Sequence, residues 1–248
     1  MADAMLVNRI WFCAITFLMM ITLSILTGKT VTAGIITLFM MVSGYFVIAV
    51  FRSKKRLNLL EEKCDPQAFL AATERQRKIT GKNQNINAYL NIDRAAGLML
   101  LGEFQKAKDV LDATDQSRLS VKNGTQFAYT VNLILCYYAL GQTDAAEQLF
   151  ETQVPLLSPV SPRMTQAMEF LVAERLFYLS RFEESKEKFR RLEGEKLSRR
   201  KRLELAYRLA QIEEASGAPD SARQKFEEAA ATDSKLWVSA QARSRRGN

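Results

Sequence analysis

The pattern of apolar and polar positions divides the chain near residue 51. Residues 10–27 contain no ionisable side chain apart from Cys13, and residues 31–51 contain none apart from Tyr45. As a helix rising about 1.5 Å per residue, each run is about long enough to cross the ~30 Å hydrocarbon core of a bilayer. From residue 52 onward, apolar residues recur every three or four positions among charged ones, which is typical of amphipathic helices in water.

The first two runs predict a transmembrane hairpin over residues 1–51, with helices at about 10–27 and 31–51. Only Gly28-Lys29-Thr30 separates them, which is too short for anything but a tight antiparallel connection. Small residues such as Gly34 and Gly44 would let the two backbones approach closely. A cleaved signal peptide is the alternative, because Val31-Thr32-Ala33 offers small residues to a peptidase. The length of the first run and the second run directly after it favour the hairpin.

Flanking charge predicts the orientation of this hairpin. Arg52-Ser53-Lys54-Lys55-Arg56 follows the second run directly, whereas Lys29 is the one cation in the connecting loop. Because positive charge is retained on the cytoplasmic side, we expect both termini in the cytoplasm and a multi-pass cell-membrane protein with two spans. Residues 52–81 then read as a helical juxtamembrane tether, in which Asp65-Pro66 begins a second helix and Gly81 ends it.

Residues 82–233 contain four copies of one sequence motif. In each copy a small residue stands at a turn, and the next helix carries a small residue and then a large apolar one. The turn residues are Gly102, Gly141, Ser180 and Gly217, separated by 39, 39 and 37 residues. No stretch alternates apolar and polar residues with a period of two, so we predict an all-α fold. A near-constant period of this length indicates about four stacked helical hairpins, an α-solenoid. Their helices are expected at about 86–101 with 103–113, 125–140 with 143–153, 163–179 with 182–193, and 200–216 with 219–232.

This repeated motif resembles that of the tetratricopeptide repeat family. In that family small residues let the paired helices approach, and large apolar residues fill the gap between hairpins. The positions that carry the resemblance are Ala95, Gly102, Phe104, Ala107 and Leu111; Leu133, Gly141, Ala146 and Phe150; Ala173, Phe182, Ser185 and Phe189; and Ala210, Gly217, Ala222 and Phe226. The resemblance implies a concave groove, lined by the first helix of each hairpin, that binds a protein or peptide partner. By position its candidate residues are Tyr89, Ile92, Met99, Val131, Leu135, Tyr138, Phe170, Glu174, Phe177, Tyr207 and Gln211. The alternative is that the chain's own tether helices, residues 52–80, fill the groove or pack on its first hairpin.

Residues 234–248 are expected to form a capping helix and a basic tail. An end repeat needs a cover for its open apolar edge, and Trp237 is the candidate for that role.

Candidate chemistry is sparse. The chain has no His and only three Cys, at positions without metal-ligand spacing. Carboxylate pairs such as Glu61-Glu62 and Glu213-Glu214 are interpreted as solvated helix faces. We therefore predict no catalytic residue, no cofactor and no metal.

The net charge of +8 bears on function only through two clusters of basic side chains. Each is a candidate contact for anionic lipid headgroups, and the plainer interpretation of the second is a solvent-exposed turn. Nucleic-acid binding is not expected, because no aromatic residues interleave with the cations. The clusters are Arg52, Lys54, Lys55 and Arg56, and Arg199, Arg200, Lys201 and Arg202.

These observations favour a non-enzymatic scaffold or adaptor anchored in a bacterial inner or plasma membrane. The alternative is a small accessory subunit of a membrane transport or envelope-assembly complex, with the transmembrane hairpin as its functional contact. The lack of charged side chains within the two apolar runs argues against an ion path through them.

Overall fold

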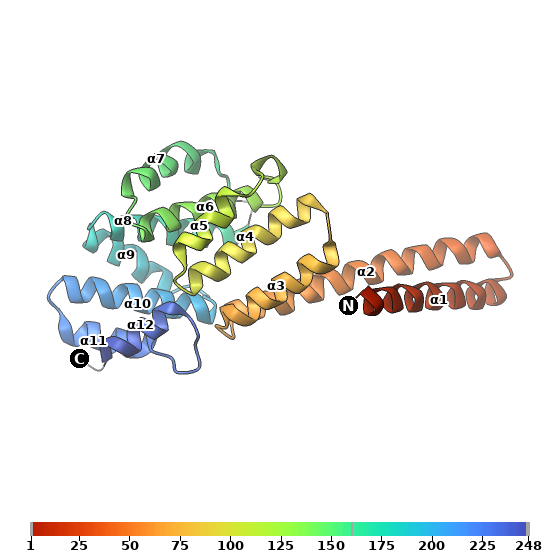
Figure 1. Ribbon diagram of the computed structural model, residues 1–248. Coiled ribbons are helices and arrows are strands. Elements are labelled where there is room, and N and C mark those ends of the chain that lie inside the picture. Colours follow the sequence, from red (N-terminus) through yellow and green to blue (C-terminus); the bar gives the residue numbers. More distant parts are fainter. Residues whose placement is uncertain (1, 160, 247–248) are drawn as a thin grey trace. The chain divides into compact units, whose positions relative to one another are not determined.

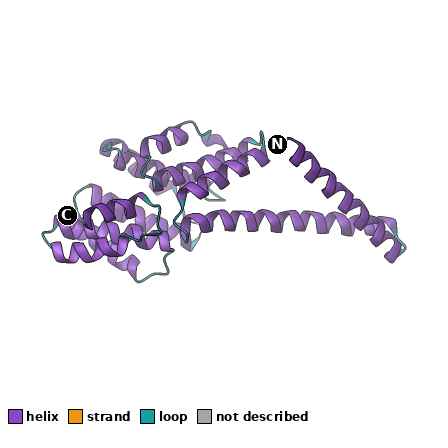
Figure 2. Cartoon of the chain, turned by 60° about the horizontal axis from the view of Figure 1, so that its bottom comes forward, coloured by secondary structure: helices purple, strands orange, loops and turns teal. Residues whose placement is uncertain are grey.

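The computed structural model describes residues 2–159 and 161–246, and that part of the chain contains helices and no strands (Figure 1, Figure 2). The chain divides into two compact units, Met1–Lys55 and Arg56–Asn248. The all-α prediction is therefore confirmed for the described residues.

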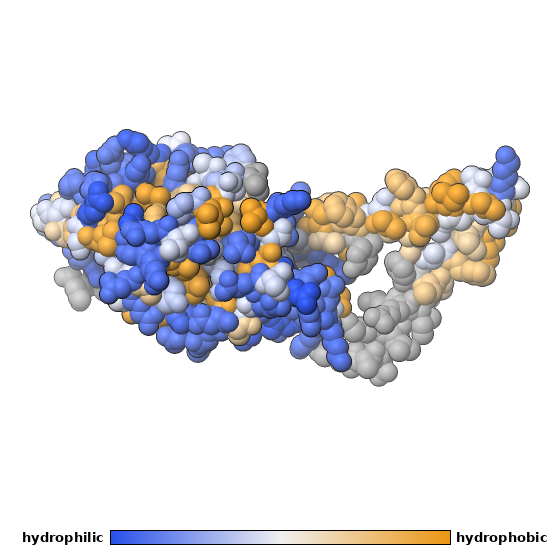
Figure 3. Space-filling model, turned by 90° about the horizontal axis from the view of Figure 1, so that it is seen from above, coloured by the Kyte–Doolittle hydropathy of each residue, from blue (hydrophilic) through white to orange (hydrophobic). Residues whose placement is uncertain are grey.

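The first unit consists of helix α1, Ala2–Thr27, and most of helix α2, Thr30–Glu61. Gly28 turns the chain between them in the left-handed region, with φ +64°. Large apolar side chains of this unit lie on its surface; Phe39, for example, is 72% exposed. In the space-filling view the coloured part of this unit is largely apolar (Figure 3). Among the described residues, Thr30–Glu61 is long and apolar enough to cross a membrane, and Cys13–Thr27 is a shorter apolar stretch.

Helix α2 continues beyond the predicted span through the basic residues to Glu61, because Arg, Lys and Leu are all good helix formers. One expectation about this segment differs from the structure. A Cβ atom added at Gly34 or Gly44 would meet nothing within 4 Å, so neither residue marks a close approach of two helices.

The second unit begins with the end of α2 and continues as helices that pair in sequence. Asp65 caps the first of them, α3, by accepting a hydrogen bond of 2.9 Å from the Ala68 amide. The elements are α3 Pro66–Thr80, α4 Gln84–Leu100, α5 Phe104–Asp112, the 3₁₀ turn η1 Gln116–Arg118, α6 Thr125–Ala139, α7 Thr143–Gln153, the 3₁₀ turn η2 Val154–Leu156, α8 Pro162–Tyr178, α9 Phe182–Glu193, α10 Arg199–Ala215, α11 Pro219–Ala229 and α12 Trp237–Arg246. The predicted hairpins thus appear as α4–α5, α6–α7, α8–α9 and α10–α11.

The four hairpin turns share one backbone conformation. Gly102, Gly141, Ser180 and Gly217 all have positive φ, at 81°, 73°, 59° and 74°. In every turn the next amide donates to a carbonyl five residues earlier, at 2.9 Å each time, which closes a Schellman motif. Ser180 adopts the same conformation although its Cβ makes it costly. The repeat predicted from the sequence is therefore a structural repeat.

Close packing inside each hairpin follows from the small residues of the second helices. Ala107, Ala146, Ser185 and Ala222 are each at most 3% exposed. The hydroxyl of Ser185 is satisfied by donating to the Ala173 carbonyl at 2.8 Å. These are the positions that the sequence pattern assigned to helix–helix contact.

The two ends of the hairpin series meet and close it into a ring. Leu60, Cys64, Phe69 and Leu100, from α2 to α4, share one buried cluster with residues of α10, α11 and α12. The Lys235 amide donates to the Cys64 carbonyl at 2.9 Å. In Figure 1, α10 and α12 lie beside the junction of α2 and α3. We call the contacts between residues 60–69 or 100–104 and residues 198–207 or 233–242 the seam.

Trp237 lies at the seam. Its ring packs edge-on against Tyr207 of the last hairpin, at 5.5 Å between centroids, on the repeat that it is expected to cover. It also packs edge-on against Phe104 of the first hairpin, at 5.6 Å. The sequence pattern did not predict that second contact.

Two turn glycines allow a matched test of the seam. A Cβ on Gly102 would lie 3.2 Å from the Trp237 Cβ, whereas one on Gly141 would meet nothing within 4 Å. Both residues have positive φ, so Gly→Ala carries a similar backbone cost of about 1 kcal/mol at each. We expect Gly102→Ala to lower the free energy of unfolding by about 1–2 kcal/mol more than Gly141→Ala, because Trp237 must move. Equal losses in urea titrations would contradict the contact.

Candidate functional site

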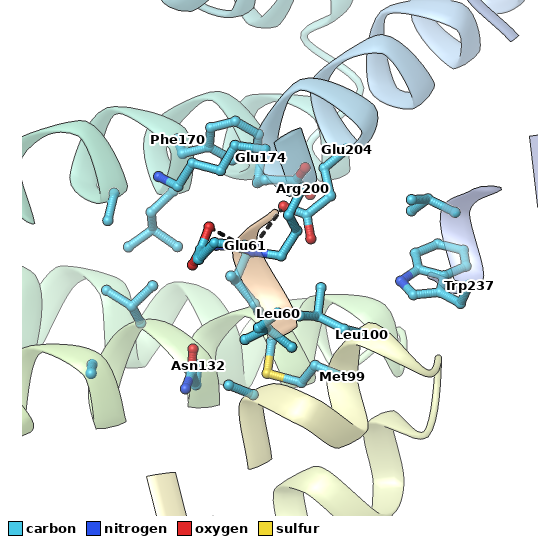
Figure 4. Close-up of a pocket in the computed structure, with 18 of the residues that line it drawn as sticks. Leu60, Glu61, Met99, Leu100, Asn132, Phe170, Glu174, Arg200, Glu204 and Trp237 are labelled. Atoms are coloured by element: carbon cyan, nitrogen blue, oxygen red, sulfur yellow. Dashed lines mark hydrogen bonds and ion pairs between the residues drawn. The ribbon is translucent and has the colours of Figure 1, made fainter. Parts of the chain in front are cut away.

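The inner helices of the ring surround a cavity of about 310 Å³ (Figure 4). Helices α4, α6, α8 and α10 contribute most of its walls, and the end of α2, the start of α12, Phe69 of α3 and Phe104 of α5 complete it. Most of the lining is apolar. Most polar lining residues lie on α2, α8 and α10, and Asp93 of α4 and Asn132 of α6 are polar as well. Six residues predicted for the groove lie on this wall: Ile92, Met99, Val131, Leu135, Phe170 and Glu174.

The other five predicted groove residues do not line this cavity. Tyr138 is 2% exposed and stacks on Tyr178, at 5.1 Å between centroids. Tyr207 packs against Phe226 and Trp237. The remaining three lie in other contacts: Phe177 against Phe182, Tyr89 against Arg56, and Gln211 as the acceptor of a 2.7 Å bond from Arg208.

The end of α2 lies against the concave side of the ring. Leu57, Leu60 and Glu61 are part of the cavity wall. Figure 4 shows Leu60 and Glu61 between Phe170 and Glu204 on one side and Asn132 and Met99 on the other. Helix α3 packs along α4. The sequence left open whether the groove is free for a partner or whether the tether helices fill it or pack on the first hairpin. In the structure the tether helices occupy part of the groove and cover the first hairpin.

Arg200 joins α2 to α10 through two carboxylates. It donates to Glu61 at 3.0 and 3.2 Å and to Glu204 at 2.8 Å. The Ser198 hydroxyl donates to Glu61 at 2.5 Å. Burial disfavours the charge on Glu61, but the Arg200 charge and these hydrogen bonds outweigh it and lower the pKa of Glu61 to about 2. Burial raises the pKa of Glu204, because Arg200 only partly compensates for its desolvation.

This arrangement gives stability a pH dependence. The pKa of Glu61 is lower in the folded state than its ordinary 4.5, so its contribution is complete above pH 4.5 and is lost as pH falls towards 2. A shift of this size corresponds to about 3 kcal/mol. We expect the melting temperature of wild type to fall more steeply than that of Glu61→Gln between pH 5 and 3. The other carboxylates are present in both proteins and contribute equally to both. Equal slopes of melting temperature against pH for wild type and Glu61→Gln would therefore show that Glu61 does not stabilise the seam.

Two further buried ion pairs lie at the cavity. Arg208 donates to Glu174 at 2.9 and 3.1 Å and to the Tyr178 hydroxyl at 2.8 Å, and its guanidinium covers the Phe177 ring at 4.6 Å. Arg56 donates to Asp93 at 2.6 Å. Burial raises the pKa of Asp93 to about 6, despite the charge of Arg56.

The basic residues predicted to meet anionic headgroups have several different environments. Arg52, Lys54, Lys55 and Arg202 are exposed. Arg56 forms an internal ion pair with Asp93, and Arg200 forms internal ion pairs with Glu61 and Glu204. Arg199 donates to Asp233 at 2.8 and 2.5 Å. The prediction that Glu61 and Glu213 belong to solvated faces is wrong: Glu61 pairs with Arg200, and Glu213 is 6% exposed and pairs with Lys186 at 2.9 Å.

Lys201 is the functional candidate whose environment the sequence did not reveal. It is half-buried in the cavity wall, with its ammonium 5.2 Å from the centroid of Phe170. Within the part of the chain that the structure describes, this ammonium has no ion pair and no hydrogen bond. Burial, and then the neighbouring Arg200 charge, lower the pKa of Lys201 to about 8. The sequence does not indicate that Lys201 lines a cavity, because it stands in a run of four cations that resembles a solvent-exposed turn.

No family model matches the sequence, and no curated protein matches it. Among solved structures, the chain is similar to one from Podosopora anserina, described as a kinesin light chain with nearly identical TPR-like repeats. The identity is 19%, the TM-score is 0.38, and the alignment covers 79% of this chain and 94% of that one. A TM-score of this size does not establish a shared fold. The assignment of this chain to the α-solenoids of helical hairpins rests on its own four turns and their packing.

Proposed function

We propose that this chain is a non-enzymatic scaffold of tetratricopeptide type, anchored in a cell membrane and presenting its ring of hairpins to the cytoplasm. The observation that carries the proposal is helix α2. One unbroken helix begins as an exposed apolar segment and ends with Leu57, Leu60 and Glu61 in the wall of the ring. Lipid hydrocarbon would cover its apolar part, because water does not tolerate so large an apolar surface.

Helix α1 would complete the anchor as a second span. Its uncharged run, residues 10–27, is at about 1.5 Å per residue just long enough for the ~30 Å core of a bilayer. Arg52, Lys54 and Lys55 follow the apolar part of α2 and are exposed, so they would lie at anionic headgroups on the cytoplasmic side. Both termini would then be cytoplasmic.

The partner would be a protein segment that enters the concave face when the seam opens. The closed cavity, at about 310 Å³, has no room for a helix of about 10 Å diameter. The end of α2 indicates which chemistry this face accepts: Leu57 and Leu60 lie on the apolar wall and Glu61 binds Arg200. We therefore propose an amphipathic segment with leucine-like side chains and a carboxylate that competes with α2 for Arg200.

The test is site-specific photocrosslinking of the full chain in native membranes. With the crosslinker at Leu135 on the concave wall, we expect a saturable protein adduct that increases when Glu61→Gln weakens the seam. The matched control carries the crosslinker at Leu156, which is 69% exposed and outside the ring's interior. No adduct at Leu135 would contradict the concave site. Adducts confined to positions in α1 and α2 would favour an accessory subunit that acts through its membrane helices.

A further inference from the structure

Large apolar side chains are well exposed at few places in the second unit, and most of these places lie together. Among the described residues of the unit they are Ile79, Ile86, Val121 and Leu156. Ile79 stands in the last turn of α3 and Ile86 in the first turn of α4, on either side of the turn at Gly81. Val121 stands in the loop between η1 and α6.

The loop that carries Val121 lies against the start of α4 (Figure 1). Arg118 donates to the side-chain oxygen of Gln84 at 2.9 Å, and Ile86 and Asn123 line the same surface pocket. The turn between α3 and α4 and the loop before α6 therefore form one continuous surface. We call this surface, residues 78–86 and 118–123, the α4 end face.

Every charged residue of the α4 end face is basic. Its cations are Lys78, Lys82, Arg118 and Lys122. Residues 75–92 and 116–143 contain no Asp or Glu. Arg118 pairs with Asp115 at 3.3 Å, whereas the three lysines are exposed and have no ion pair within the part of the chain that the structure describes. Exposed apolar side chains among uncompensated cations match the interface of an anionic bilayer.

The α4 end face lies at the end of the second unit where the chain enters it. Arg56, the first residue of this unit, donates to Asp93 at 2.6 Å and to the Tyr89 hydroxyl at 3.2 Å, within two turns of Ile86 on α4. The long apolar run of α2 ends at Phe51, five residues before Arg56 and therefore about 8 Å away along the helix. If the apolar part of α2 spans the bilayer, so short a connection keeps Arg56 within reach of the headgroups.

We propose that the α4 end face rests on the anionic phospholipid surface of the membrane that holds the anchor. Its three apolar side chains would lie among the headgroups, and its three lysines would pair with lipid phosphates. Burial of apolar side chains and attraction to anionic lipid act together in such contacts, and salt screens the attraction. The inference rests on the proposed membrane anchor and adds a second contact, which would hold the ring in one orientation on the bilayer.

The test uses the full chain in lipid nanodiscs, with a fluorophore on one introduced cysteine and a nitroxide on the lipid headgroups. Cys13→Ser removes the exposed native thiol, and Cys64 and Cys136 are buried. In discs that contain phosphatidylglycerol, we expect the nitroxide to quench a fluorophore at Val121→Cys at least about threefold more than one at Leu156→Cys, which is exposed outside the face. Discs of phosphatidylcholine alone should reduce this difference.

Charge substitutions separate attraction to lipid from simple proximity. Lys82→Gln with Lys122→Gln should lower the quenching at position 121 at least about twofold in the anionic discs. Lys188→Gln with Lys196→Gln removes the same charge at exposed positions that have no ion pair among the described residues, and it should leave the quenching unchanged. Equal quenching at positions 121 and 156, or equal effects of the two double substitutions, would overturn the inference. A face that binds a protein instead would leave position 121 unquenched in discs that hold the purified chain alone.

Trp11 shows in the same discs whether the anchor itself is present. It is 64% exposed on α1, whereas Trp237 is half-buried at the seam. Bromine on the lipid acyl chains should therefore quench the emission of Trp11. Quenching of Trp11 without quenching at position 121 would overturn the inference and leave the anchor standing. If Trp11 is not quenched either, the proposed anchor fails together with the inference.

Discussion

Replacing Arg200 by alanine is expected to destabilise the ring more than any other single change at the seam. The substitution leaves Glu61 and Glu204 buried beside each other without their shared cation. Removing one member of a buried ion pair typically costs about 3–5 kcal/mol, because the remaining charges stay desolvated and unpaired. Arg202→Ala, on the same helix but exposed and without an ion pair among the described residues, should change the free energy of unfolding by less than about 0.5 kcal/mol.

Thiol labelling distinguishes opening of the seam from global unfolding in this variant. Cys64 is buried at the seam, and Cys136 is buried in the cluster between the first two hairpins. In native conditions we expect Arg200→Ala to expose Cys64 to a maleimide while Cys136 stays protected. If both thiols react at the same rate, Arg200 supports the whole unit rather than the seam. If neither reacts faster than in wild type, the ion-pair network does not hold the ends together.

Trp237→Ala is expected to have the second-largest effect. The indole packs on Tyr207, Phe104 and the bare face of Gly102, so the substitution removes contact on both sides of the seam at once. Truncation of a large aromatic side chain in a core costs about 3–5 kcal/mol, and we expect the lower end because the ring is half-buried. Trp237→Phe should retain most of the stability. The effect is measured by urea unfolding of the full chain in nanodiscs, and a loss under about 1 kcal/mol would contradict a structural role at the seam.

The hairpins were predictable because their signal is local and repeated. Ser180 illustrates this: it lacks the glycine of the other turns, yet the aromatic Phe182 and the spacing placed a turn there, and its backbone has the same left-handed conformation. Small residues such as Ala107 and Ala146 were assigned to helix contacts for the same reason, and both are fully buried.

Ring closure was not predictable, because it depends on residues far apart in sequence. Glu61 and Arg200 are 139 positions apart, and each alone resembles an ordinary residue of a solvated helix face. Nothing in the run from Ser198 to Arg202 distinguishes the inward Arg200 and Lys201 from the exposed Arg202. The concave residues of the sequence prediction were therefore only partly those that line the closed cavity.

The measurement that tests ring closure most directly is the exchange rate of the Lys235 amide hydrogen in the full-length protein. Lys235 lies between α11 and α12, and its amide donates to the Cys64 carbonyl at the other end of the hairpin series. Because this bond exists only while the seam is closed, closure predicts that the Lys235 amide exchanges as slowly as amides inside α10. Exchange at the rate of an unprotected loop, with α10 still protected, would contradict the closed ring.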